Sequence, residues 1–376
     1  MTISSSFRPG WGRSWVLAVS LFAVAAPGQE IPANPPAIPA DTSKLPHIVL
    51  VSMGGTIASR ATTRLNITNY GGKDIPRVDP QDWIHDLPEL ATIARVTTED
   101  CRPPAASSAS ETYADMQKVS RLLNKLAQDP TVDGMVVTHG TNTMAEVAYY
   151  VDLVVKSEKP IVFVGSQRPW SGLSGDGPLN LFNAVRVAAS PDAWRRGVLH
   201  CMNQNINTAR DVQKTSAYRV QTFKAIDVGP IGFADPDKVV FYREPTRLHT
   251  YKSEFAGMDF PSLPTVEIFY SYTEAPGYMI DAAVEHGAKG LVIDGTGAGS
   301  ATPSQTEAIK RAQAKGLVVV MTTRTRGGRV QETTRRTETM IVNGDNLPPE
   351  KARLLLQLAL TQTSDWKAVK RYFDQY

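Results

Sequence analysis

Short apolar runs alternate with amphipathic stretches along almost the whole chain from residue 46 onwards. The apolar runs are typical of buried strands, and they fall at 47–52, 134–138, 161–165, 197–202, 265–270, 290–294 and 317–321. The stretches with apolar residues on one side predict helices at 144–156, 178–189, 279–286, 304–314, 349–361 and 366–373. Strands that alternate with helices in this way indicate a parallel sheet covered on both faces.

This alternation is interrupted once, between Tyr242 and Pro264, where charged and polar residues follow no clear period. A chain of 376 residues has room for about two domains. We therefore expect an α/β protein with a larger N-terminal parallel-sheet domain at 46–242 and a smaller C-terminal α/β domain at 264–376, joined by an interdomain linker at 243–263.

The first residues have the pattern of an export signal. Arg8 and Arg13 precede an apolar run at 15–26, which is about the length of a signal-peptide core and too short to span a bilayer. The run includes the small-residue cleavage pattern Ala23-Val24-Ala25. Residues 1–26 therefore predict a signal peptide and a periplasmic or secreted protein, with an uncleaved membrane anchor as the alternative. The Pro- and Ala-rich segment 27–45 then predicts an extended linker.

Charge and cysteine content narrow the choice of partners and cofactors. The net charge of +3 falls to about +1 without Arg8 and Arg13, a balance that does not favour nucleic acid or an anionic membrane as a partner. Cys101 and Cys201 are either one disulfide or two buried free thiols, since the sequence does not fix their distance. No Cys/His cluster has metal-ligand spacing, so we expect no metal and no cofactor, and a small-molecule substrate.

The candidate chemistry lies where two of the apolar runs end. Each run reaches a glycine and then a threonine, at Thr56 and at Thr141. Ligands of α/β proteins bind outside the carboxyl ends of parallel strands. Two hydroxyls placed there can meet at one substrate, although 85 positions separate them in the sequence.

Blocks around both threonines are similar to signatures of bacterial-type L-asparaginases, and further matching blocks follow in the same order. The resemblance covers the chain from about residue 46 to its end and is greatest to the exported type II branch. The matching blocks are Met53-Gly54-Gly55-Thr56-Ile57-Ala58, Thr138-His139-Gly140-Thr141-Asn142-Thr143-Met144, Gly165-Ser166-Gln167-Arg168-Pro169, 176–185, Arg210-Asp211-Val212-Gln213-Lys214 and 356–363.

The resemblance implies roles for four residues in catalysis. Thr56 is the expected nucleophile, Tyr70 lies on a mobile lid, and Thr141 acts with Lys214 on protons and water. Each residue also has an ordinary structural interpretation: Thr56 as the N-cap of the next helix, Tyr70 as loop packing and Lys214 as a solvated lysine. A tyrosine hydroxyl would need cationic neighbours to act as a base.

The resemblance also implies five substrate-binding residues: Ser108, Asn142, Ser166, Glu274 and Glu332. At two places the sequence departs from the family pattern: Ala109 follows Ser108 where the family has Gln or Glu, and Asn142 stands where the family has Asp. That aspartate would pair with the α-ammonium group of the substrate. We expect Glu274 and Glu332 of a neighbouring subunit to supply the missing negative charge, with a solvated Glu274 and a tolerated Asn142 as the alternative.

The expected function is hydrolysis of L-asparagine to L-aspartate and ammonia through a threonine acyl-enzyme, with glutaminase activity left open. The resemblance implies a homotetramer whose active sites are shared between subunits. Two rivals remain: an enzyme of the same fold that prefers glutamine, a D-amide or a modified amide, and a non-catalytic periplasmic binding protein. The glycine-rich segment 294–300 lacks the spacing of a dinucleotide-binding loop and predicts a turn at a domain or subunit junction.

Overall fold

The computed structural model describes residues 38–39, 41–71, 75, 77–104 and 107–376. The signal peptide expected at 1–26 lies outside the described residues, and so does most of the linker expected at 27–45. The described residues belong to one compact unit, which spans Pro36–Tyr376. Within the described part, no helix is both long and apolar enough to cross a membrane.

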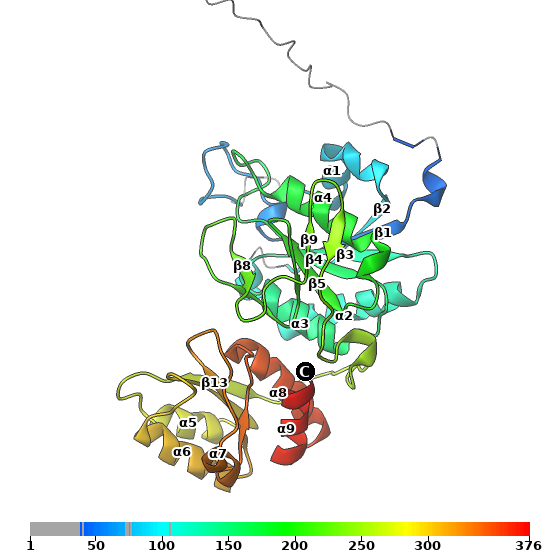
Figure 1. Ribbon diagram of the computed structural model, residues 1–376. Helices are drawn as coiled ribbons and strands as arrows, with labels where there is room; N and C mark the ends of the chain where they lie inside the picture. Colours follow the sequence, from blue (N-terminus) through cyan, green and yellow to red (C-terminus); the bar gives the residue numbers. More distant parts are fainter. Residues whose placement is uncertain (1–37, 40, 72–74, 76, 105–106) are drawn as a thin grey trace, which may run out of the picture. The chain divides into compact units, whose positions relative to one another are not determined.

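The first sheet has eight strands in the order β10-β9-β6-β5-β4-β3-β1-β2, of which β1 to β5 and β9 are labelled in Figure 1. Five strands run parallel: β1 (His47–Ser52), β2 (Arg95–Asp100), β3 (Gly134–Thr138), β4 (Ile161–Val164) and β5 (Val198–Met202). Three short strands add an antiparallel edge: β6 (Asn205–Thr208), β9 (Gly232–Ala234) and β10 (Val239–Phe241). The predicted parallel strands are confirmed, whereas the alternating pattern did not indicate the antiparallel edge.

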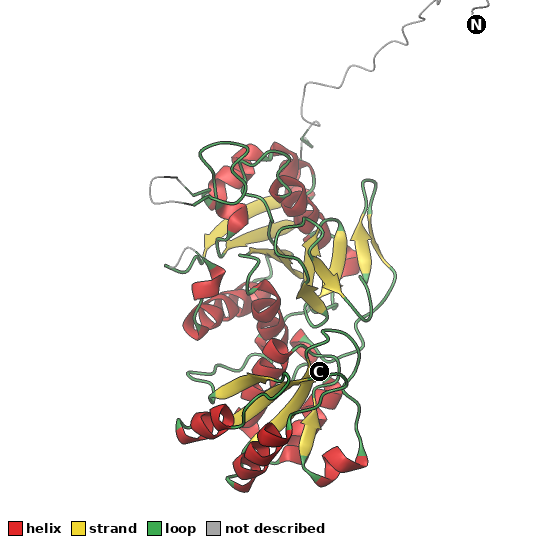
Figure 2. Cartoon of the chain, turned by 90° about the vertical axis from the view of Figure 1, so that its left-hand side faces the viewer, coloured by secondary structure: helices red, strands yellow, loops and turns green. Residues whose placement is uncertain are grey.

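Helices lie on both sides of this sheet, as Figure 2 shows. They are α1 (Pro80–Asp86), α2 (Tyr113–Gln128), α3 (Met144–Val154) and α4 (Gly177–Ala188). Every residue of β3, β4 and β5 is buried, which explains why these strands have no polar alternation. The short 3₁₀ helix η2 (Thr56–Ala58) and the hairpin β7–β8 (Val212–Lys214 and Phe223–Ala225) bring further site residues.

The second sheet is smaller and entirely parallel, in the order β11-β12-β13-β14. Its strands are β11 (Val266–Tyr270), β12 (Gly290–Gly295), β13 (Val318–Thr323) and β14 (Ile341–Asn343). Its helices are α5 (Tyr278–Glu285), α6 (Pro303–Ala314), α7 (Thr334–Glu338), α8 (Pro349–Gln362) and α9 (Trp366–Gln375). A mixed α/β protein with one large and one smaller sheet is therefore confirmed.

Helix α8 connects the two sheets. It packs against α3 on one side and against β11, β12 and β13 on the other. Its buried leucines belong to the same apolar core as the strands of the first sheet. The boundaries predicted at 243 and 263 stay a prediction, because this core continues across them.

Both cysteines are buried free thiols. Burial raises the pKa of the Cys201 thiol to about 12, so this side chain is a poor nucleophile at neutral pH. Of the two alternatives drawn from the sequence, the structure has the free thiols.

Candidate active site

Two glycines allow the ends of β1 and β3 to approach closely. These strands are neighbours in register, with Ser52 beside Thr138. A Cβ atom added to Gly55 would lie 2.3 Å from the Cα atom of Gly140, and Gly55 has a φ of 86°. Only glycine fits this position, and the contact brings the two Gly-Thr motifs together as the sequence predicts.

Thr56 is the first residue of η2, and Gly55 occupies the N-cap position. Because the N-cap is Gly55 and not Thr56, the interpretation of Thr56 as a helix cap is wrong. Its Oγ1 atom lies 2.9 Å from the Tyr70 Oη atom, and either hydroxyl can donate in this hydrogen bond. The residue expected on a lid therefore contacts the residue expected as nucleophile.

The second pair comes from two other elements. Thr141 follows β3 and is almost fully buried, and Lys214 is the last residue of β7. The Lys214 Nζ atom donates a hydrogen bond to Thr141 Oγ1 over 2.8 Å. Partial burial lowers the pKa of Lys214 below the ordinary lysine value, which favours the neutral amine that can accept a proton.

Both pairs line one cavity of about 340 Å³. A cavity of this size is in the usual range for a small-molecule site. Six of the predicted site residues lie on its wall: Thr56, Tyr70, Ser108, Thr141, Asn142 and Lys214. The other lining residues are Gly55, Ser59, Ile67, Thr68, Gly71, Arg77, Ser107, Gly140, Gln167, Ala217 and Tyr218.

Two polar atoms on residues of this wall are buried with no hydrogen-bond partner among the described residues. They are Ser108 Oγ and Gln167 Nε2. Buried polar groups are normally paired, so this hydroxyl and this amide are both able to bond a ligand or a water molecule. A Cβ atom at Gly140 would lie 2.5 Å from Ser108 Oγ, so that glycine also leaves room for the serine.

Asn142 lies at the rim of the cavity and is exposed. Its Nδ2 atom donates to Ser107 Oγ over 3.4 Å. Ser107 also caps the short helix η4 (Ser108–Ser110), since its Oγ accepts a hydrogen bond from the Ala109 backbone. The position at which the family has a carboxylate thus carries a neutral amide bonded to a neutral hydroxyl.

Three predicted substrate-binding residues do not line the cavity. Ser166 is fully buried and donates to the Arg168 carbonyl over 2.6 Å, while the next residue, Gln167, lies on the cavity wall. Glu274 follows β11 in a left-handed turn with a φ of 61°. Glu332 lies 3.3 Å from Lys370 Nζ. Roles for Glu274 and Glu332 in another subunit's site stay predictions.

Several residues on the wall were not expected from the sequence, among them Arg77, Ser107, Gln167 and Tyr218. Only Gln167 had a usable signal, because it follows a buried strand just as Thr141 does. Arg77 and Tyr218 come from loops whose path no periodicity predicts. Within the described ranges, no group of three or more His, Cys, Asp or Glu side chains could hold a metal ion.

Two family models match the chain. Residues 47–247 match "Asparaginase, N-terminal", and residues 265–373 match "Glutaminase/Asparaginase C-terminal domain". Together they cover both sheets and every candidate site residue named above.

Curated relatives match over nearly the same length. "L-asparaginase 2" of Bacillus subtilis is 39% identical over 88% of this chain and 87% of its own. "Probable L-asparaginase periplasmic" of Haemophilus influenzae is 38% identical over 90% of this chain and 95% of its own. "Glutaminase-asparaginase" of Pseudomonas fluorescens is 36% identical over 95% of both chains.

A solved structure has the same fold. The crystal structure of a probable cytoplasmic L-asparaginase from Campylobacter jejuni superposes with a TM-score of 0.83, at 36% identity, over 88% of this chain and 100% of that one. With both family models and these relatives spanning its described structure, the chain belongs to the asparaginase family of enzymes.

Proposed function

We propose that this protein hydrolyses the side-chain amide of L-asparagine to L-aspartate and ammonia through an acyl-enzyme on Thr56. The observation that carries the proposal is the presence of two polar pairs, Thr56–Tyr70 and Thr141–Lys214, on the wall of one cavity. Covalent amide hydrolysis needs a nucleophile, a proton acceptor close to it and a second group that activates water. Each pair offers a hydroxyl beside a group that exchanges protons.

The first step forms a bond between Thr56 Oγ1 and the amide carbon of the substrate. The hydroxyl proton passes to a neighbouring acceptor, and the C–N bond breaks as the nitrogen takes up a proton and leaves as ammonia. Water then attacks the ester carbonyl, the bond to Oγ1 breaks, and aspartate is released with Thr56 restored. Hydrogen bonds to the developing charge lower the barrier of both steps.

Lys214 is the proposed proton acceptor of the second pair. A neutral amine at Nζ can draw a proton from Thr141 Oγ1, or from water held beside it, and return that proton later. Burial lowers the pKa of Lys214, so more of this amine is neutral near pH 7 than in a solvated lysine. The rate of ammonia release should therefore rise with pH as Lys214 loses its proton. The midpoint of this rise should lie below the ordinary pKa of a lysine side chain.

The test compares ammonia release by the purified protein with that of Thr56→Ala, Thr141→Val and Lys214→Met. Loss of a catalytic hydroxyl or amine should lower kcat by a factor of about 10²–10⁴ while the protein stays folded. Ser59→Ala is a control, because Ser59 lines the same cavity but its Oγ donates to the Gly55 carbonyl. An undiminished rate in Thr56→Ala would refute the proposed mechanism.

A second candidate function is hydrolysis of an amide that has a carboxylate but no free α-ammonium group. It is favoured by the charges on the described cavity wall, where Arg77 is cationic and Asn142 is neutral. An N-acylated asparagine fits this wall better than a zwitterion unless Glu274 or Glu332 of another subunit adds negative charge. The ratio of kcat/KM for L-asparagine to that for N-acetyl-L-asparagine decides between the two functions.

Location and assembly complete the proposal. A periplasmic protein is consistent with the charged and apolar pattern of residues 1–26 and with a relative that is named periplasmic. A homotetramer would give Glu274 and Glu332 a site to complete. Sedimentation of the mature protein tests the assembly, and fractionation of the source cells tests the location.

A further inference from the structure

Lys351, a fully buried lysine, binds the backbone just before Lys214. Lys351 lies on α8 and has no exposed surface. Its Nζ atom donates to three carbonyl oxygens, those of Ala209 (2.7 Å), Arg210 (2.9 Å) and Val212 (2.6 Å). Ala209 and Arg210 lie in the turn that leads from β6 into β7, Val212 begins β7, and Lys214 ends it.

The Lys351 ammonium group thus uses all three of its donors on one short segment. Burial of an ammonium group is costly unless strong hydrogen bonds compensate for the lost water. Burial lowers the pKa of Lys351 below the ordinary lysine value, which reflects this cost, while the three carbonyl acceptors favour the charged ammonium form. Since the three carbonyls belong to neighbouring residues, the lysine can keep these bonds only if the turn keeps its shape.

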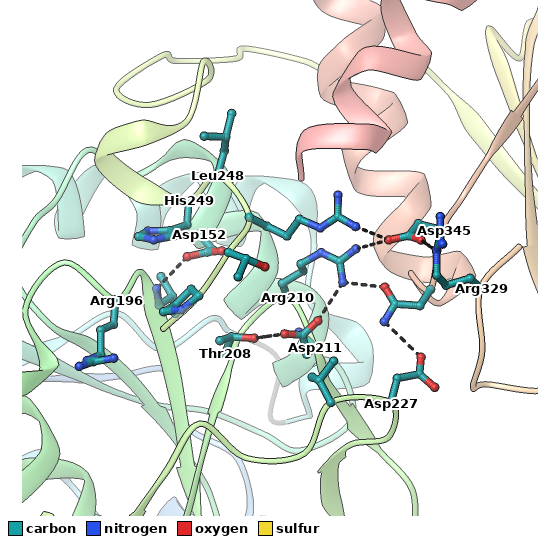
Figure 3. A pocket seen from close by; sticks show the side chains of 16 residues that line it. Asp152, Arg196, Thr208, Arg210, Asp211, Asp227, Leu248, His249, Arg329 and Asp345 are labelled. Atoms are coloured by element: carbon teal, nitrogen blue, oxygen red, sulfur yellow. Dashed lines mark hydrogen bonds and ion pairs between the residues drawn. The ribbon is translucent and has the colours of Figure 1, made fainter. Parts of the chain in front are cut away.

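The Arg210 side chain on the same turn is held from the C-terminal part of the chain as well. It donates to Asn346 Oδ1 over 2.8 Å and to Asp345 Oδ2 over 3.3 Å, and it also bonds Asp211. Figure 3 shows Arg210 and Asp345 pointing toward each other in a cavity of about 290 Å³ that shares no lining residue with the active-site cavity. Asp345 also receives bonds from Arg247 and Arg329.

The bonds from Lys351 and the bonds made by the Arg210 side chain hold the same segment, which leads directly to Lys214. Val212 and Lys214 are two residues apart in a strand, which is about 7 Å along the backbone. A displacement of the turn therefore moves Lys214 Nζ relative to Thr141 Oγ1. Misplacement of a catalytic group by about 1 Å can cost a factor of about 100 in rate.

We propose that Lys351 is a positioning residue that holds the Lys214–Thr141 pair in its reactive geometry through the backbone of residues 209–212. Lys351 does not line the active-site cavity, so it acts without touching the substrate. This inference rests on the proposed function, because it assigns a role in proton transfer to Lys214.

The test is Lys351→Met, with Arg353→Met as the matched control. Arg353 lies on the same helix and also donates to a backbone carbonyl, but that carbonyl belongs to Val266 of β11, far along the chain from Lys214. Each kcat is divided by the fraction of sites that a covalent active-site label titrates, so unfolded molecules do not count.

Lys351→Met should lower kcat per site by about 10–100-fold with KM within two-fold of the original. It should also move the acid limb of the pH–rate profile to higher pH, because a loosened Lys214 becomes more solvated. Arg353→Met should change neither kcat per site nor the position of the acid limb. If Lys351 has a purely structural role, Lys351→Met would lower the fraction of sites that the label titrates and leave kcat per site and the acid limb unchanged.

Asn346→Ala provides a second variant if Lys351→Met does not fold. It removes one bond to Arg210 at a half-buried position and should lower kcat per site by about 3–10-fold, with the same shift of the acid limb. The inference is overturned if the folded variants keep the original kcat and acid limb while Lys214→Met is inactive. If Lys214→Met itself keeps its activity, both the inference and the proposed role of Lys214 are wrong.

Discussion

Gly55 and Gly140 are in backbone contact across the ends of β1 and β3. A Cβ atom on Gly55 would meet the Cα and N atoms of Gly140 at 2.3 and 2.4 Å. The contact fixes the distance between the Thr56 and Thr141 motifs. The backbone of Gly55 or Gly140 cannot shift without moving the strand that precedes it. The spacing of the two hydroxyls is therefore set by the sheet.

Gly55→Ala should abolish most of the activity and lower the melting temperature. The added methyl group needs a backbone shift, which costs about 1–3 kcal/mol, and a φ of 86° adds about 1–2 kcal/mol. Gly54→Ala is the control, because Gly54 has a similar φ of 83° but its Cβ would lie 3.8 Å from the nearest atom. Equal activity of the two variants in an ammonia-release assay would show that the contact is unimportant.

Lys214→Arg should be nearly inactive although it keeps a positive charge. An arginine stays protonated at any pH at which the protein is folded, so it cannot accept the proton that we assign to Lys214. We expect kcat to fall by about 10²–10⁴. Lys224→Arg, an exposed position on the paired strand β8, should keep full activity. A half-active Lys214→Arg would mean that Lys214 acts only through its charge.

Asn142→Asp should change which substrate the cavity prefers. A carboxylate at this rim would pair with an α-ammonium group, and charge-assisted hydrogen bonds are about twice as strong as neutral ones. The kcat/KM for L-asparagine should rise by about 10-fold relative to that for N-acetyl-L-asparagine. An unchanged ratio would show that the ammonium group is bound elsewhere, in line with the hypothesis for Glu274 and Glu332.

That hypothesis has its own test. If Glu274 of a neighbouring subunit replaces the carboxylate that is missing at position 142, Glu274→Asn alone should weaken the binding of L-asparagine. Combined with Asn142→Asp, the same change should restore most of the activity. The hypothesis fails if the double variant is no better than the worse single variant when KM for L-asparagine is compared.

Asp152 should make stability depend on pH. Asp152 accepts a hydrogen bond from the Val198 backbone over 2.7 Å, and burial raises its pKa to about 7. Between about pH 4 and pH 7 the folded state therefore binds more protons than the unfolded state, so stability from this group is lost as pH rises. One proton corresponds to about 1.4 kcal/mol per pH unit.

Asp152→Asn keeps the hydrogen bond without the charge. In urea unfolding, the variant should exceed the original protein in stability by more at pH 8 than at pH 5. Asp192→Asn, at an exposed position, should show no such divergence. A constant difference between Asp152→Asn and the original at both pH values would contradict the assignment.

The strands and helices of this fold follow closely from the sequence where a segment is long and strictly patterned. The helix predicted at 144–156 is α3, and the strand predicted at 161–165 is β4, each within two residues. The short strands β6, β9 and β10 escaped prediction because three or four residues carry too little periodicity. Their pairing is decided by neighbours distant in the chain.

The candidate site was also predictable in part, where its residues directly follow a strictly patterned strand. Thr56 and Thr141 could be placed because each follows a glycine at the end of a buried strand, where the sheet fixes its direction. Ser166 and Gln167 could not be told apart, since adjacent residues leaving a strand face opposite sides and a shift of one residue exchanges them. Lys351 has a position in the sequence typical of an ordinary surface lysine, and only the fold reveals its three carbonyl partners.

The most direct test of the account is to trap the intermediate during turnover of L-asparagine. The reaction is stopped with acid within milliseconds, and the protein is digested and analysed by mass spectrometry. The acyl-enzyme mechanism predicts one modified peptide, which contains Thr56 and is heavier by an aspartyl group, and its absence from Thr56→Ala. Ammonia release at full rate with no modified peptide, or with the added mass on another residue, would contradict it.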